Sequence, residues 1–295
     1  MSRDVISDEA WAVLGPLFPA VKASGRPPVD RRTVVEVTAW RFRTGAPWRD
    51  LPERFGNWNT IYKNFDRWSK AGVWARVLEQ VQAMAHQGGD VDWTVSIDST
   101  IARVHQHGAT LARDKGGTVE VPEARRRTAD HAIGRSRGGL TTKTHLVADG
   151  KGRALAFVLT GGQVADTTML PDTLEEIRVA GATGRPRQRP DRLLAGKGYP
   201  SRANRAWLRE RGIATTIPER DDQIAHRRKR PGRPIDFGDE QRRQYRGRNV
   251  VERCFNKLKQ WRGLAMRSDK TARNHHSGQC IAAALHWVQT FSNTA

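Results

Sequence analysis

The sequence predicts an all-α N-terminal domain followed by an α/β domain in which a mixed sheet is flanked by helices. Three observations lead to this prediction. Apolar residues recur at helical spacing through residues 1–88, strand-like alternation begins after Gly88-Gly89, and residues 89–295 then alternate strands with helices. We therefore expect two domains, at 1–88 and 89–295, with the boundary at residue 88.

The first domain is expected to begin with a helix that starts at Ser7-Asp8-Glu9 and reaches Phe18. The sequence GRPP at 25–28 breaks the chain, because proline cannot continue a helix. Asp30 can then cap a second helix that runs through Trp40. These segments predict a helical domain rather than a strand-rich one.

A helix-turn-helix-like arrangement is predicted next. Residues 48–55 form a short helix, Gly56 forms the turn, and residues 58–69 form a longer helix with an apolar stripe along one side. The other side of the longer helix carries side chains of the types that contact phosphates and base edges, namely Thr60, Lys63, Asn64 and Arg67. A plain helical bundle with a solvated face would give the same pattern, and the charge of the whole chain favours DNA binding.

The second domain opens with the strand pattern VDWTVSID, which ends at Asp98. A polar stretch rich in Gly and Arg at 105–139 has no periodicity and predicts a mobile basic loop. The later elements are a two-strand hairpin around 149–152, helices at 168–180, 201–211, 249–263 and 272–291, and strands at 193–195 and 213–217. The order strand, hairpin, helix, strand, helix, strand, long helix is characteristic of the ribonuclease-H-like α/β fold.

The chain carries 51 Lys and Arg against 31 Asp and Glu, a formal net charge of +20 over 295 residues. An excess of this size predicts a polyanionic partner, and nucleic acid is the main candidate. A membrane surface is the runner-up, but no long basic amphipathic helix supports it. The sequence has no apolar run long enough to span a membrane, no secretory signal, and only two cysteines. We expect a cytoplasmic, nucleoid-associated protein with reduced thiols.

Two acidic residues stand where DNA-cutting chemistry would need them on this fold. Cleavage of a phosphodiester requires an activated water or 3′-hydroxyl and a stabilised leaving oxygen, and two Mg²⁺ ions can supply both. Because Mg²⁺ prefers carboxylate oxygens, acids are needed on the first strand, after the fourth strand and on the long helix. Asp98 fits the first position, although an Asp that simply caps the end of a strand would look the same. Glu252 fits the third position.

Glu252 lies in a specific sequence context. The pattern Y-x2-R-x3-E-x6-K is formed by Tyr245, Arg248, Glu252 and Lys259. Spacings of four and seven place the last three on one face of a helix. A carboxylate between basic groups suits a metal ion together with a DNA phosphate, whereas a lone Glu and Lys would indicate only a solvated, salt-bridged helix.

Further segments accompany this pattern: FGNWNTIYKNFDRWSKAGVW, VSIDST, GRSRGGLTTKTHLVAD and NVVERCFNKLKQWRGLA. With them the chain resembles, over nearly its whole length, the DDE transposases of the insertion-sequence-5 family. That family lies in the insertion-sequence-4-like clan, which carries the YREK signature. The resemblance implies a protein that binds terminal inverted repeats in double-stranded DNA, cuts to expose 3′-hydroxyls and joins them to target DNA.

The resemblance also implies residue roles. Asp98 would be the first metal-binding acid and Glu252 the third, with Mg²⁺ as the cofactor and Mn²⁺ as a substitute. Tyr245, Arg248 and Lys259 are expected to contact DNA. Transposases generally cut as multimers, so the resemblance implies a homodimer or higher multimer on DNA.

The second acid is missing from this sequence. In similar proteins it lies in an A-D-K-x-Y sequence just after the fourth strand, and here LLAGKGY places Gly196 at that position. Since glycine has no carboxylate, we predict weakened binding of one metal ion and severely impaired cleavage. Lys197 and Tyr199 adjoin this position and are expected to contact DNA.

Other polar and aromatic residues near these positions are weaker candidates for binding a metal ion or DNA. Asp191 starts the same short strand but points to its opposite face, which makes it a poor substitute for the missing acid. Asp166 could approach the site, but we expect it to start the next helix instead. His105 and His107 lack further ligands at metal spacing and are expected to contact phosphate or water, or to be polar loop residues. Trp261 could stack on a base or pack in the core.

Three functions remain open at this point. The first is a transposase whose cleavage is impaired, and the second is a catalytically inactive, domesticated or decayed DNA-binding protein. The third is an unrelated RNA-binding or structural protein, which the YREK pattern disfavours. Gly196 is the feature that separates the first two, and intact inverted repeats around the gene would favour recent decay over domestication.

Overall fold

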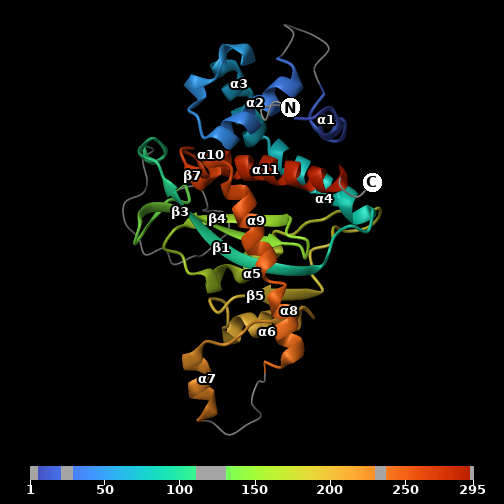
Figure 1. Cartoon of the computed structure of the whole chain (residues 1–295), viewed down its shortest axis with the longest axis vertical. Coiled ribbons are helices and arrows are strands. Elements are labelled where there is room, and N and C mark those ends of the chain that lie inside the picture. Colours follow the sequence, from blue (N-terminus) through green and yellow to red (C-terminus); the bar gives the residue numbers. More distant parts are fainter. Residues whose placement is uncertain (1–5, 21–28, 111–130, 230–236, 293–295) are drawn as a thin grey trace.

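The computed structural model describes residues 6–20, 29–110, 131–229 and 237–292. A group of N-terminal helices stands above the sheet, and a second group of helices extends from its lower end (Figure 1). The N-terminal α-helices are α1 (Asp8–Leu14), α2 (Arg31–Thr44), α3 (Trp58–Lys70) and α4 (Val73–Gln87). Short 3-10 turns lie between them at η1 (Gly15–Leu17), η2 (Trp48–Asp50) and η3 (Glu53–Phe55).

The predicted short helix at 48–55 is wrong, because this segment forms only η2 and η3. Pro52 has no N–H to donate, and Leu51 before it is extended, with φ −62° and ψ 130°. α3 begins as predicted, since the side chain of Asn57 caps it by accepting from the N–H groups of Asn59 and Thr60. The helix-turn-helix interpretation therefore stays a prediction, with two 3-10 turns in place of its first helix.

The sheet has the strand order expected for the ribonuclease-H-like fold. Its strands are β1 (Thr94–Val104), β2 (Gly134–Ser136), β3 (Gly139–Ala148), β4 (Ala154–Gly161), β5 (Arg192–Ala195), β6 (Ala214–Thr216) and β7 (Met266–Arg267). β3 is antiparallel to both β1 and β4, whereas β5 pairs parallel with β1 and β6 pairs parallel with β5. The mixed order β4-β3-β1-β5-β6 confirms the predicted fold class.

The remaining helices connect and flank these strands. They are η4 (Gln106–Ala109), η5 (Asp166–Met169), α5 (Leu170–Glu175), α6 (Arg202–Glu210), α7 (Asp221–Arg228), α8 (Asp239–Arg246), α9 (Asn249–Lys259), α10 (Arg262–Ala265) and α11 (Ala272–Ser292). The predicted helix at 168–180 is too long, because Val179 forms a backbone bridge with Arg187 soon after α5 ends. Of the predicted loop at 105–139, residues 111–130 lie outside the described residues, and its end forms β2.

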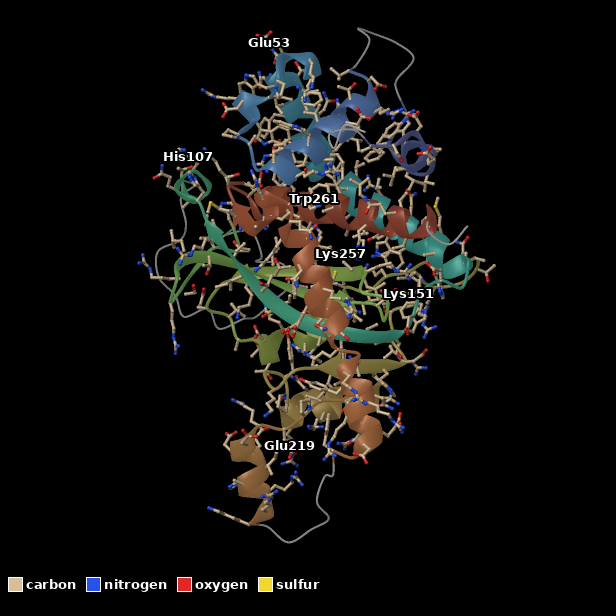
Figure 2. All side chains as sticks on the ribbon, viewed as in Figure 1. Glu53, His107, Lys151, Glu219, Lys257 and Trp261 are labelled. Atoms are coloured by element: carbon tan, nitrogen blue, oxygen red, sulfur yellow. The ribbon has the colours of Figure 1, made fainter. Side chains whose placement is uncertain are left out.

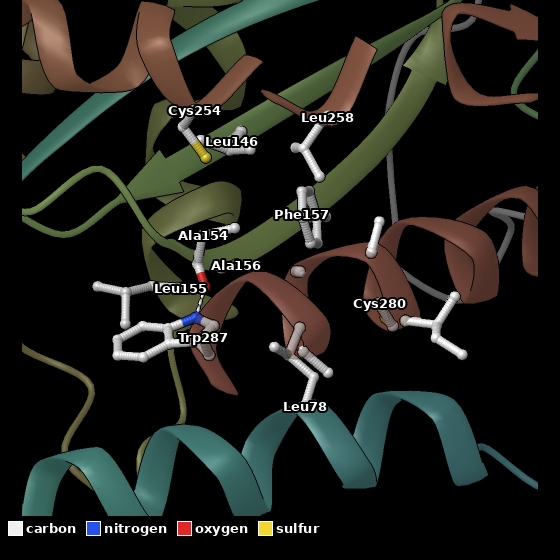
Figure 3. Close-up of a cluster of buried hydrophobic side chains, with 14 of the residues drawn as sticks. Leu78, Leu146, Ala154, Leu155, Ala156, Phe157, Cys254, Leu258, Cys280 and Trp287 are labelled. Carbon is white, nitrogen blue, oxygen red and sulfur yellow. Dashed lines mark hydrogen bonds between the residues drawn. The ribbon is translucent and has the colours of Figure 1, made fainter. Parts of the chain in front are cut away.

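The core is continuous between the N-terminal helices and the sheet. α11 lies between α4 and the sheet, with Leu78 of α4 on one side and Phe157 of β4 on the other (Figure 3). The buried indole N–H of Trp287 donates to the carbonyl of Ala154 at 2.8 Å, and the side chain of Gln82 donates to the same carbonyl at 3.0 Å. α4 is thus bonded to the sheet, and a division of the chain at residue 88 remains a proposal.

Candidate active site and nucleic-acid interface

Asp98 lies in the middle of β1, beside the carboxyl end of β5. The last paired residues of the two parallel strands are Ile97 and Ala195, so Asp98 and Gly196 are neighbours one step further on. The prediction that the strand ends at Asp98 is wrong. β1 continues to Val104, because residues 98–103 pair with β3, and the polar Ser-Thr sequence that suggests a strand end takes part in this ladder.

The guanidinium of Arg248 joins the two predicted acids. Arg248 stands at the start of α9 and Glu252 lies in its first turn, four residues later. Nη1 of Arg248 donates to Oε1 of Glu252 at 2.8 Å, and Nη2 donates to Oδ2 of Asp98. The planar fork of an arginine suits this bridging of two carboxylates. α9, which packs on β1, therefore brings the first and third predicted positions together.

Gly196 faces the same guanidinium. A Cβ atom built on Gly196 would lie 3.2 Å from Nη2 of Arg248. The backbone of Gly196 does not have a positive φ, so its conformation does not require glycine. The structure thus places all three predicted positions around one arginine, and we call Asp98, Gly196, Arg248 and Glu252 the acidic site.

Burial and charge act against each other on Asp98. Burial raises the pKa of Asp98 above its ordinary value, and the charge of Arg248 opposes this rise. The carboxylates of Asp166 and Glu252 add to the rise because like charges disfavour ionisation. The guanidinium is consequently the group that lowers the pKa of Asp98 most.

Asp166 and Asp191, the two alternative acids, have other partners. Oδ1 of Asp166 accepts from Oγ of Ser99 and from Nζ of Lys143, each at 2.8 Å. Asp166 begins η5, as expected, but its side chain does not cap this 3-10 helix. Ser99 follows Asp98 along β1, so its side chain lies on the opposite face of the strand, but the Asp166 carboxylate that it binds is still close enough to raise the pKa of Asp98. Asp191 is exposed and paired with Arg187 at 2.6 Å.

Lys143 is a residue that the sequence interpretation missed. Its side chain is only 14% exposed, and the ammonium group reaches both Asp166 and the carbonyl of Val164. Burial would raise the pKa of Asp166, but hydrogen bonds from Lys143 and Ser99 lower it. The available signal in the sequence was a lysine in the middle of the predicted strand TTKTHLVAD.

The side chains of the acidic site do not fit a pair of divalent ions as they stand. Mg²⁺ in phosphate chemistry needs one or two carboxylates in addition to the substrate phosphates. Both carboxylates here are already paired with Arg248, and position 196 offers no side chain. Among the described residues, no three His, Cys, Asp or Glu side chains gather closely enough to hold a metal ion.

The other residues predicted to contact DNA around this site differ in exposure. Lys197 is exposed and lies 3.2 Å from the carboxylate of Asp221, and Lys259 is exposed, with Nζ 3.3 Å from the carbonyl of Ile101. Tyr245 is half-buried and packs edge-on against Phe237. Tyr199 requires a correction. It is 1% exposed within the core, so it cannot reach a DNA strand in this structure, and burial raises the pKa of its hydroxyl.

The polar face of α3 is open to solvent. Thr60, Lys63 and Arg67 are exposed and Asn64 is half-buried. The amide of Asn64 donates to the carbonyl of Thr60 at 2.9 Å, and Arg67 donates to Asn64 at 2.6 Å. These bonds join Thr60, Asn64 and Arg67 along one side of the helix, and the exposed Lys63 lies beside them. This side is accessible and carries two positive charges, as a surface that meets phosphates requires.

The histidine pair and Trp261 lie away from the acidic site. His107 is at the outer end of β1 and Trp261 lies beneath the N-terminal helices (Figure 2). The rings of His105 and His107 are 4.8 Å apart, and Nδ1 of His105 accepts from the backbone N–H of His107. Trp261 is half-buried against the core, and the guanidinium of Arg43 lies over its ring at 5.4 Å. Its packing role is therefore the better supported one.

Comparison with known proteins identifies the family. Residues 89–287 match the model of the transposase DDE domain, and residues 6–78 match that of a putative transposase of the IS4/5 family. The chain belongs to the DDE transposases of insertion sequences. The predicted family is thereby confirmed, and a DDE domain of this kind generally works with a divalent metal ion.

Three relatives illustrate the match of this transposase. A putative transposase for insertion sequence element IS402 of Burkholderia cepacia is 35% identical over 51% of this chain and 64% of its own length. A putative transposase for element IS6501 of Brucella ovis is 28% identical over 51% of this chain and 100% of its own length. An uncharacterized protein, y4sN, of Sinorhizobium fredii is 35% identical over 40% of this chain and 92% of its own length. Within the described ranges, no helix is long and apolar enough to cross a membrane.

Proposed function

We propose that this transposase binds the terminal inverted repeats of its element and target DNA as a dimer or higher multimer, but cuts DNA poorly. The observation that carries the proposal is the meeting of Asp98, Gly196 and Glu252 at one arginine on a ribonuclease-H-like sheet. The family reaction needs three acids at these positions, and this chain supplies two. We propose Mg²⁺ as the ion of that reaction, with Mn²⁺ as a substitute.

The exposed cations favour a DNA path from the N-terminal helices to the acidic site. In this proposal residues 1–88 hold a transposon end through Lys63 and Arg67 of α3, and residues 89–295 receive the strand beside Lys197 and Lys259. The net charge of +20 favours the same partner, because phosphates relieve the self-repulsion of the protein. The protein would then act on the nucleoid in the cytoplasm.

A catalytically inactive DNA-binding protein is the second candidate, and Gly196 is the observation that favours it. Both candidates bind DNA, so they differ only in residual cleavage. The state of the DNA around the gene separates them further. Intact inverted repeats would favour a recently active transposase.

DNA binding can be tested by titrating a fluorescent random-sequence duplex at several salt concentrations. If five cations neutralise phosphates, the logarithmic salt slope should be roughly −4 to −5. Lys63→Gln should reduce the size of the slope by about 1. Lys70→Gln is the matched control on the same helix. Its ammonium is already paired with Asp66 at 2.7 Å, so the slope should not change.

The proposal fails if binding is insensitive to salt, because phosphate contacts would then be absent. The proposed contact of α3 with DNA also fails if Lys63→Gln and Lys70→Gln change the salt slope equally. In that case the lost charge would act through the field of the whole protein rather than through a contact.

A further inference from the structure

Arg248 has the position that a bound cation would take in the acidic site. Its guanidinium contacts Asp98 on β1 and Glu252 on α9, and it borders the position of the missing third acid at Gly196. Its side chain is only 16% exposed, and its pairing with Asp98 joins two elements that are 150 residues apart in the sequence. It therefore closes the site rather than lying on a solvated surface.

The same contacts set up a competition for the carboxylates. A divalent ion on Asp98 and Glu252 would have to break both ion pairs or tolerate a positive charge within a few ångströms of itself. Like charges at such distances repel strongly where water is partly excluded. With glycine at position 196, no third carboxylate is present to offset this repulsion.

We propose that Arg248 is the resident cation of the acidic site and competes with divalent metal ions for Asp98 and Glu252. The inference rests on the proposed assignment of these two residues as the acids of the site. It explains how two carboxylates can persist beside each other in the free protein. It also explains why the missing acid matters: a metal ion must displace this internal cation from two carboxylates without a third carboxylate to favour the metal.

The test measures binding of Mn²⁺ to the full chain by electron paramagnetic resonance, in the absence of DNA. Arg248→Gln removes the internal cation and should tighten Mn²⁺ binding by about tenfold or more. Arg253→Gln is the matched control, since Arg253 is exposed on the same helix and the loss of charge is equal. It should change the affinity by less than about threefold, because an exposed charge is screened.

Two further variants make the test specific. Asp98→Asn added to Arg248→Gln should abolish the gain, which would place the ion on Asp98. Arg248→Lys keeps the charge but loses the fork that holds both carboxylates, so it should bind Mn²⁺ more tightly than the wild type and less tightly than Arg248→Gln. If circular dichroism shows that Arg248→Gln does not fold, Arg248→Lys alone tests the competition.

The inference is overturned if Arg248→Gln and Arg253→Gln bind Mn²⁺ alike, if Arg248→Lys binds it as the wild type does, or if the gain survives Asp98→Asn. DNA binding, measured on the same samples, separates this result from the proposed function. If the wild type binds no DNA while Arg248→Gln gains Mn²⁺ affinity, the proposed function is refuted and the competition is supported.

Discussion

A buried ion pair joins the N-terminal helices to the C-terminal part of the chain. Nη1 of Arg41 in α2 lies 3.0 Å from Oδ2 of Asp269, and the two side chains are 3% and 4% exposed. The substitution Asp269→Asn would leave the charge of Arg41 buried without a counter-ion. Removal of one partner from a buried pair typically destabilises a protein by about 3–5 kcal/mol.

The pKa of Asp269 gives a second value for the stability that Asp269→Asn should lose. Burial alone would raise this pKa, but Arg41 and His275 lower it from 3.8 to about 2. This difference corresponds to roughly 2–3 kcal/mol of stability. The contribution is complete above pH 3.8, where the carboxyl is ionised in both states, and is lost as the pH falls from 3.8 towards 2. We therefore expect a destabilisation of about 3 kcal/mol at pH 7 that becomes smaller at pH 3.

Urea unfolding followed by tryptophan fluorescence measures this loss, since the chain has 10 tryptophans. Asp191→Asn is the matched control. Its ion pair with Arg187 is exposed, so the substitution should change the free energy of unfolding by less than about 1 kcal/mol. A loss below about 1 kcal/mol for Asp269→Asn, or an equal loss at pH 7 and pH 3, would refute the reasoning.

Two further predictions concern the core. Gly278→Ala should destabilise the protein by about 1–3 kcal/mol in the same urea assay, because the new Cβ would lie 2.2 Å from Cε1 of the buried Phe42. Unchanged stability would mean that α2 and α11 can separate freely. Burial lowers the pKa of His145 from 6.5 to about 4, so the wild type should lose roughly 3 kcal/mol as the pH falls from 6.5 to 4. His145→Gln should have a shallower dependence of Tm on pH in this window, and an equal slope would contradict the assignment.

The elements that the sequence predicted well are those whose signals are local. α3 and α6 each begin directly after a residue whose side chain caps them, Asn57 and Ser201. The position of Gly196 beside Asp98 also followed from the sequence, because the strand pattern and the fold class together fix which strand ends meet. The structure has this arrangement, with Ile97 and Ala195 as the last paired residues.

The features that the sequence did not predict depend on partners far along the chain. β1 continues past Asp98 because β3 supplies a ladder for Ser99 and its neighbours. Tyr199 follows the exposed Lys197 closely but turns into the core, and no local pattern specifies that direction. Asp166 starts a short 3-10 helix as predicted, but its carboxylate binds Lys143, 23 residues away, which the sequence did not indicate.

Cleavage of a plasmid that carries the gene with its flanking DNA, by the wild type and by Gly196→Asp in Mg²⁺, tests the central claim most directly. The backbone at position 196 accepts a side chain, and the group nearest to a Cβ atom there would be the guanidinium of Arg248, with Nη2 at 3.2 Å. The account predicts that both proteins bind the DNA and that Gly196→Asp cuts it about a hundredfold faster or more. Equal cutting by both proteins, or a Gly196→Asp protein that binds but does not cut, would contradict it.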